Sequence, residues 1–139
     1  MEFREFDNYY VIRIEKGEEI VNSIKDLCLK EDIRLGSISG IAAANLIEIG
    51  LFNVDTKQYR TETFEGMFEI TSLTGNITRK GDEVYMHMHV NFSDETNMVR
   101  GGHFVRAVVS AACEVIINKI DGAVGREFNQ EIGLNLLKF

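Results

Sequence analysis

The feature that most constrains the fold of this chain is a succession of short β-prone stretches separated by turn-forming residues. These stretches, rich in β-branched and aromatic residues, cover residues 33–38, 45–54, 58–64, 67–78 and 83–92. Alternating strand and turn signals of this kind are typical of antiparallel strands joined by short connections. The clearest hairpin is expected at residues 78–83, where Gly81 and Asp82 form the turn. The sequence therefore predicts a mostly antiparallel β-sheet.

One segment near the N-terminus has helical periodicity instead. Between residues 17 and 31, apolar residues recur three and four positions apart, and charged residues occupy the other faces. Glu18 and Glu19 near its start and Lys30 near its end also suit the helix dipole. We therefore expect one long helix, about residues 17–31, packed on the sheet in an α+β fold.

The remaining segments are less uniform. Residues 3–14 and residues 132–139 both resemble strands, one at each end of the chain. Residues 103–120 fit two patterns, because polar residues recur there at helical spacing whereas Val115 to Ile117 is typical of a buried strand. We expect strand in the second half of this segment.

Length and composition predict a single domain. A chain of 139 residues, of which 45% are hydrophobic, is long enough to bury a core without disulfides or structural metals. It contains no proline and no low-complexity linker that would mark a domain boundary. We therefore expect one domain covering residues 1–139.

Two features bear on the cellular compartment. The first seven residues include several charged side chains and form no apolar signal segment, and the longest apolar runs are too short to span a bilayer. Cys28 and Cys113 lie in apolar surroundings, which predicts reduced cysteines buried in the core. We expect a cytoplasmic protein without membrane contact.

The charge of the chain argues against nucleic-acid binding. Its net charge is -7, from 15 Lys and Arg against 22 Asp and Glu, and no basic run is present. Affinity for DNA depends largely on basic side chains that neutralise phosphates. DNA is therefore a partner that the charge does not support, although a local basic patch on an assembled surface could still form.

All three histidines of the chain lie within one stretch, which points to a metal site. His87 and His89 are two residues apart, so on a β-strand both imidazoles point to the same face. His103 follows after a connection long enough to turn and come back. Three neutral imidazoles on one ion, with at least one coordination position open, suit a divalent metal, and Zn²⁺ first. The alternative interpretation is a polar strand face plus an unrelated histidine.

Two charged residues are further candidates for a site. Glu114 is the only acidic residue between Phe104 and Ile117, so it could accept a hydrogen bond from a metal-bound imidazole or act as a catalytic acid or base. An exposed strand or helix residue is the equally weighted alternative. Arg126 could anchor an anionic ligand near the site or cap a loop, and the loop is the favoured interpretation.

Several short phrases of the sequence occur in a familiar order. They are Gly36 to Ala43, Gly50 to Phe52, Phe68 to Ile77, His87 to Val90, Gly101 to His103, Ala112 to Val115 and Arg126 to Phe128. Together they resemble the plants and prokaryotes conserved (PPC) domain in its free-standing prokaryotic form, over nearly the whole chain. The resemblance implies an α+β fold that assembles as a homotrimer, and a metal held by His87, His89 and His103.

The same resemblance carries a DNA-binding label. In land plants this domain follows an AT-hook in nuclear DNA-binding proteins, and prokaryotic relatives inherit the description. An AT-hook requires an Arg-Gly-Arg-Pro core, which a chain without proline cannot contain.

Three functions are therefore considered. The first is a homotrimeric metal-binding domain that acts on or senses a small molecule at an open divalent ion; whether it is an enzyme stays open, because Glu114 is the only acid–base candidate. The second is a DNA-binding or regulatory protein of the PPC family. The third is a trimeric module that presents a platform to a protein partner.

Overall fold

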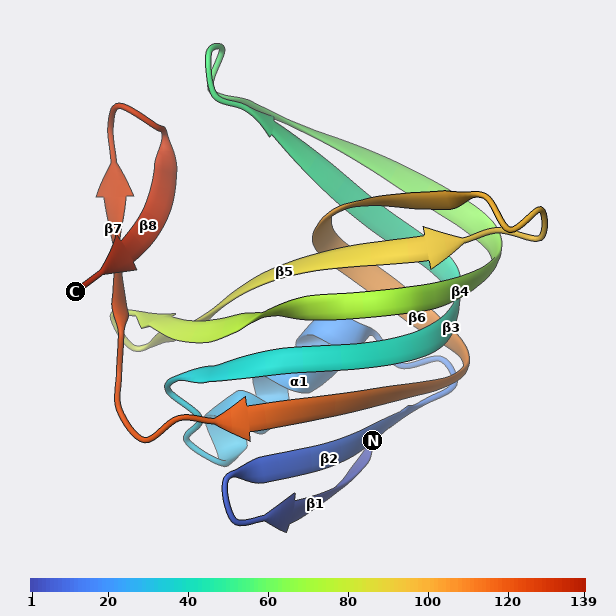
Figure 1. Cartoon of the computed structure of the whole chain (residues 1–139), viewed down its shortest axis with the longest axis horizontal. Helices are drawn as coiled ribbons and strands as arrows, with labels where there is room; N and C mark the ends of the chain where they lie inside the picture. The colour runs from blue at the N-terminus through green and yellow to red at the C-terminus, as the bar shows by residue number, and fades with distance from the viewer.

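The computed structural model describes residues 1–139 and contains a curved antiparallel sheet, one helix and a separate two-stranded hairpin (Figure 1). The elements are β1 (Glu2–Phe6), β2 (Tyr9–Glu15), α1 (Ile20–Lys30), β3 (Gly36–Asn53), β4 (Gln58–Lys80), β5 (Glu83–Ser93), β6 (Val99–Lys119), β7 (Gly125–Asn129) and β8 (Leu134–Lys138). The helix lies behind the sheet in Figure 1, and β7 and β8 stand to one side of it.

The main sheet closes partly on itself. Its six strands pair in the order β1-β2-β6-β3-β4-β5, and β5 pairs in addition with β6. Residues 99–103 of β6 pair with β5, residues 103–119 pair with β3, and residues 112–118 pair in addition with β2 on the other edge. The long, bent β6 therefore closes β3, β4 and β5 into a ring of paired strands around the core, and β1 and β2 extend the sheet beyond this ring.

The mostly antiparallel sheet predicted from the sequence is confirmed, because every strand pair is antiparallel. The hairpin at residues 78–83 is also confirmed, since Lys80 pairs with Glu83 across the β4–β5 turn.

The sequence predicted more breaks than the structure contains. Residues 33–38 and 45–54 were expected as separate strands, but half of the first and nearly all of the second belong to β3. β4 likewise joins two expected strands. Ser39, expected in a connection, pairs with Thr74 on one side and Ile116 on the other. Pairing on both edges outweighs the local turn preference, and β-bulges after Gly40 and Ala44 bend the strand instead of ending it.

Three other segments differ in detail from expectation. The first strand, expected at residues 3–14, is two strands, because the chain turns at Asp7, where φ is 52°. Residues 103–120 are strand throughout, since a spacing of four residues fits strand periodicity as well as a helical turn. The C-terminal strand is confirmed as β8, but it pairs only with β7 in a sheet of its own.

The helix is shorter than the expected 17–31. It begins at Ile20, because Glu19 is still extended (φ -90°, ψ 124°) and its carboxylate accepts hydrogen bonds from the backbone N–H groups of Val21 and Asn22. The same carboxylate also accepts from the backbone N–H of Ala107 on β6, at 3.2 Å. Glu19 thus both starts the helix and ties it to the sheet. No helix in the structure is long and apolar enough to cross a membrane.

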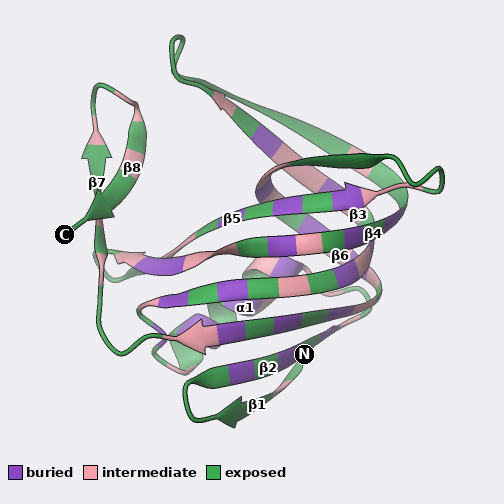
Figure 2. Ribbon diagram, in the orientation of Figure 1, coloured by how far each residue is buried: buried purple, intermediate pink, exposed green.

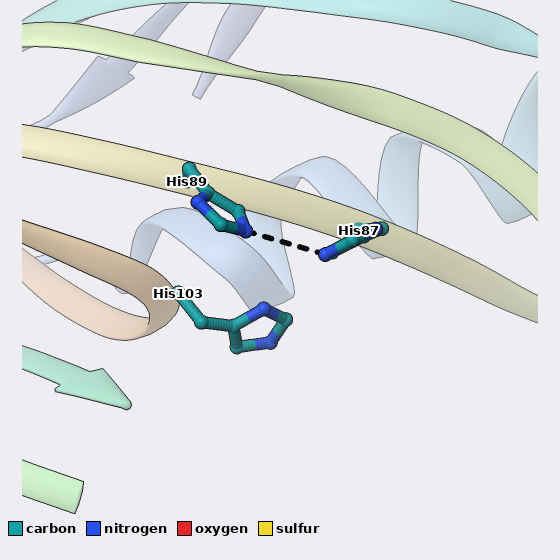
Figure 3. Close-up of side chains that lie close together, drawn as sticks. All are labelled: His87, His89 and His103. Carbon is teal, nitrogen blue, oxygen red and sulfur yellow. Dashed lines mark hydrogen bonds between the residues drawn. The ribbon is translucent and has the colours of Figure 1, made fainter. Parts of the chain in front are cut away.

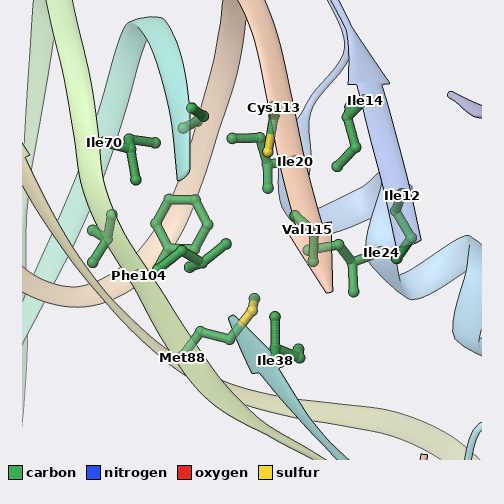
Figure 4. Packing of buried hydrophobic residues seen from close by; sticks show 14 of the residues in the cluster. Ile12, Ile14, Ile20, Ile24, Ile38, Ile70, Met88, Phe104, Cys113 and Val115 are labelled. Carbon is green, nitrogen blue, oxygen red and sulfur yellow. The ribbon is translucent and has the colours of Figure 1, made fainter. Parts of the chain in front are cut away.

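The core lies between the helix and the concave face of the sheet (Figure 4). Ile20, Ile24 and Leu27 of α1 pack there against inward-facing side chains of the strands. Cys28 and Cys113 are buried and unpaired, as the sequence predicted. Along β3 and β6, buried and exposed residues largely alternate (Figure 2), so the opposite face of the sheet is left for solvent or a partner.

We expect Glu19→Ala to lower the free energy of unfolding by about 1–3 kcal/mol, because three backbone N–H groups lose their acceptor. Urea unfolding followed by circular dichroism measures the change. Asp26→Ala, which removes an exposed charge from the same helix, is the control and should stay within about 0.5 kcal/mol of the parent. Equal losses in the two variants would contradict the role assigned to Glu19.

Candidate metal centre

The three histidines converge on the face of the sheet opposite the core, at the seam where β5 meets β6. His87 and His89 are alternate residues of β5 and project from the same face. His103 of β6 is the direct register partner of His89. Figure 3 shows the His103 ring turned towards the other two rings. The predicted grouping of these residues is therefore present.

Gly101 permits this convergence. A Cβ atom at this position would lie 2.6 Å from the carbonyl oxygen of Val90 and would also collide with the side chain of Asn91, both on β5. Glycine therefore lets the start of β6 approach β5 closely enough to bring His103 opposite His89.

A β-bulge on β6 also helps to position His103. Glu48 of β3 pairs with Arg106, whereas the next residue, Ile49, pairs with Phe104, so Val105 is an extra residue on β6. Bulges of this kind bend a strand and redirect the side chains beside them. This one lies where β6 leaves β3 to meet β5, immediately after His103.

The distances between the rings suit a shared ion. The ring centroids are 5.2 Å apart for His87 and His89, 5.3 Å for His87 and His103, and 5.6 Å for His89 and His103. One nitrogen from each ring lies within 4.8 Å of the others. The Nε2 atoms of His87 and His89 are 3.3 Å apart (Figure 3). The cluster contains no carboxylate.

The electrostatics of the site keep two of these rings neutral. Burial lowers the pKa of His103 to about 4, and the neighbouring His87 and His89 lower it further in the same direction. Burial is also the main cause that lowers the pKa of His87, and the charges of His89 and Arg126 lower it further. At neutral pH these two rings therefore present free lone pairs, which is the form that binds a metal.

Tyr59 forms one wall of the site, and no sequence pattern pointed to this residue. Its ring meets the ring of His103 edge-on, with centroids 5.7 Å apart. The phenol lies over Gly50, the register partner of His103, and a side chain at that position would occupy the same space as the Tyr59 hydroxyl group. Burial raises the pKa of Tyr59, so its hydroxyl stays protonated and available as a donor.

Arg126 lies near the histidines, and the favoured loop-capping interpretation is wrong. The residue belongs to β7 and its guanidinium reaches back to β4. Nε donates to Thr78 Oγ1 at 2.9 Å, and one terminal nitrogen donates to Asn76 Oδ1 at 2.8 Å. Asn76 is the register partner of His87. The turn between β6 and β7, remote in sequence from the histidines, thus brings a positive charge to the edge of the site.

Glu114 is not brought to the histidines. It is an exposed residue further along β6, where its register partners are Arg13 and Ile41. Ile41 and Glu114 line a groove of ≈ 940 Å³ on the outer face of the sheet. The geometry therefore favours the exposed-residue interpretation over a contact with a metal-bound ring.

Comparison with known proteins agrees with the observed fold. A family model described as the Plants and Prokaryotes Conserved (PCC) domain matches residues 1–121. No functionally curated protein shows significant sequence similarity to the chain.

Solved structures match over nearly the entire chain. A candidate DNA-binding protein from Bacteroides thetaiotaomicron is 31% identical, with a TM-score of 0.97 over 99% of this chain and 96% of its own. A metal-containing protein from Archaeoglobus fulgidus is also 31% identical, with a TM-score of 0.90 over 99% of this chain and 97% of its own. A plant- and prokaryote-conserved protein from Pyrococcus horikoshii is 30% identical, with a TM-score of 0.86 over 99% and 94% of the two chains.

We expect Gly101→Ala to destabilise the protein by about 1–3 kcal/mol, because the added methyl group must push β6 away from β5. Urea unfolding and amide hydrogen exchange of β5 and β6 measure the loss. Gly125→Ala is a matched control, since nothing lies within 4 Å of a Cβ atom there. If Gly101→Ala were as stable as Gly125→Ala, the close approach of the two strands would not be required.

Proposed function

This chain belongs to the Plants and Prokaryotes Conserved domain family, and from that premise we propose that it is a metal-binding domain whose three histidines hold a divalent ion. His87, His89 and His103 supply the ligands, and Zn²⁺ is the first candidate for the ion. The ion acts on or senses a small molecule at a coordination position that the protein leaves open. The 31% identity to a metal-containing protein from Archaeoglobus fulgidus supports the proposal.

The observation that carries the proposal is the spacing of the ring nitrogens. At Zn–N distances of about 2.0–2.1 Å and a tetrahedral angle, two ligand nitrogens lie about 3.3 Å apart. The Nε2 atoms of His87 and His89 are 3.3 Å apart, and a nitrogen of His103 lies within 4.8 Å of both. The donor set is therefore arranged on one side of a point that an ion would occupy.

The chemistry of the site follows from its donors. Three neutral imidazoles leave at least one position of a four-coordinate ion to water or a ligand, and such an ion can activate water or polarise a carbonyl group. The chain itself supplies a phenol, Tyr59, beside His103 and a guanidinium, Arg126, beside Asn76. Both can orient a small molecule at the ion. Glu114 lies elsewhere on β6, so we assign it no part in this chemistry.

We expect protein purified without a histidine tag to contain about one divalent ion per chain, and the His87→Ala and His103→Ala variants to lose it. Elemental analysis after gel filtration measures the content. Since the pKa values of both rings are lowered, protons should displace the ion only below the ordinary histidine value of about 6.5. Glu114→Gln is the control and should keep the metal. Unchanged metal content in both histidine variants would refute the assignment.

We also propose that the chain assembles as a homotrimer. The outer face of the sheet exposes Phe6, Val11, Ile41 and Ile116 along one groove, and Val11 and Ile116 are direct register partners. An apolar strip of this kind favours a covering surface. β1, which pairs only with β2, offers a free edge beside it.

Sedimentation equilibrium at micromolar concentration tests this assembly, and we expect the mass of three chains. Ile116→Glu, which places a charge in the groove, should give the mass of one chain. Leu29→Glu is the matched control, because Leu29 is similarly exposed (52% against 47% for Ile116) but lies on the helix. A monomeric parent protein, or a trimeric Ile116→Glu variant, would contradict the proposal.

DNA binding is the second candidate, favoured by the description of the Bacteroides thetaiotaomicron relative. The net charge of -7 opposes it, since few counterions would be released on contact with a duplex. We expect fluorescence anisotropy with mixed-sequence duplex to give a dissociation constant no tighter than about 10⁻⁶ to 10⁻⁴ M at physiological salt. Nanomolar binding with a steep salt dependence would place DNA binding first.

A further inference from the structure

Arg126 is a positive charge beside the histidine cluster, and hydrogen bonds fix its position. Its guanidinium donates to Thr78 Oγ1, to Asn76 Oδ1 and to the backbone carbonyl of Asn135, at 2.8–3.0 Å. It also stacks on the ring of Tyr85, 4.5 Å from the centroid. A guanidinium carries five N–H donors, so two remain after these three bonds. The side chain is thus held in place while part of its donor capacity is left over.

The charge of Arg126 is not balanced by any acidic side chain of the protein. Other arginines of this acidic chain form ion pairs, namely Arg13, Arg34, Arg60, Arg79, Arg100 and Arg106. Arg4, the remaining one, is exposed to water on β1. Arg126 is half-buried and all its hydrogen-bond partners are neutral. A partly desolvated charge without a counter-charge is costly, and an anion beside it would offset that cost.

The hydrogen bonds of Arg126 place it beside the strand pair that carries His87. Asn76 and Thr78 alternate along β4, and their register partners on β5 are His87 and Tyr85. Directly opposed side chains on one face of a sheet lie about 5 Å apart at Cβ. The guanidinium contacts three members of this group of four, Asn76, Thr78 and Tyr85, and the fourth member is His87.

The proposed ion adds a second uncompensated charge at the same place. Its ligands are three neutral imidazoles, so the two positive charges of the ion are not reduced by any carboxylate of the cluster. An ion and a guanidinium side by side favour a ligand that carries negative oxygens. The planar fork of an arginine matches the two oxygens of a carboxylate.

The walls of the site limit the size of such a ligand. Tyr59 and Gly50 close it on the side of the β3–β4 hairpin. The β7–β8 hairpin, which carries Arg126, is held against the same β3–β4 hairpin by a hydrogen bond from Lys57 Nζ to the Gln130 carbonyl, at 2.6 Å.

We propose that the site binds a small carboxylic acid. One oxygen-bearing functional group of this acid ligates the metal ion, and a carboxylate of the same molecule pairs with Arg126. This inference rests on the proposed metal-binding function and names the class of its ligand. Arg126 is the residue that selects for the carboxylate, and it does not hold the metal.

The test uses full-length protein loaded with Co²⁺, whose visible absorption reports changes in the ligands of the ion. Malonate and succinate are titrated into the parent protein, Arg126→Gln, Arg126→Lys and Arg34→Gln, with malonamide and succinamide as neutral counterparts. Arg34→Gln is the matched control, because it removes the same charge from an exposed residue that is paired with Asp32. Metal content is measured first in all four proteins.

We expect a dicarboxylate, but neither diamide, to change the spectrum of the parent protein and of Arg34→Gln. In Arg126→Gln the affinity should fall about tenfold or more at unchanged metal content, and Arg126→Lys, which keeps the charge without the fork, should fall between. Metal-free parent protein would overturn the proposed function and this inference with it. Metal-loaded protein that binds no dicarboxylate, or binds it equally in Arg126→Gln, would overturn the inference alone.

Discussion

The pairing of β5 with the start of β6 is the constraint on which the rest of the structure depends. It closes β6, β3, β4 and β5 into a ring of paired strands, and so encloses the core that α1 covers from the other side. The same pairing sets His103 opposite His89. Fold and site therefore share one contact, and Gly101 is the residue at which both would fail together. A change that loosens this seam for the sake of the site also loosens the core.

Much of the fold and part of the site could be predicted from local sequence patterns. The side-chain alternation of a strand is enough to place His87 and His89 on one face, whatever the rest of the chain does. The position of His103 beside His87 and His89 was a weaker prediction, because it depends on which strand pairs with the start of β6. The extra breaks expected in β3 and β4 came from turn-forming residues such as Ser39, whose local preference is overridden when both edges of the strand are paired.

The parts of the site that sequence patterns missed or ranked low are those brought in from far along the chain: Tyr59 was not anticipated, and Arg126 was considered but assigned first to a loop. Tyr59 lies near the tip of one hairpin and Arg126 at the start of another, and neither shares a local pattern with the histidines. Their positions depend on the contact between the tip of the β3–β4 hairpin and the separate β7–β8 hairpin. An acidic chain can therefore carry a site of positive potential, since net charge describes the whole molecule and local charge depends on such long-range contacts.

The β7–β8 hairpin has a kinetic consequence. It pairs with no strand of the main sheet, and Phe128, Leu136 and Leu137 on it stay exposed, so burial of apolar surface contributes little to holding it in place. Its attachment is largely polar, through Arg126 and the Lys57–Gln130 bond. Segments attached in this way open far more often than the core unfolds. Opening of the hairpin would therefore control access to the site. The residence time of a bound molecule would follow the opening rate of residues 125–138 and not the unfolding rate of the domain.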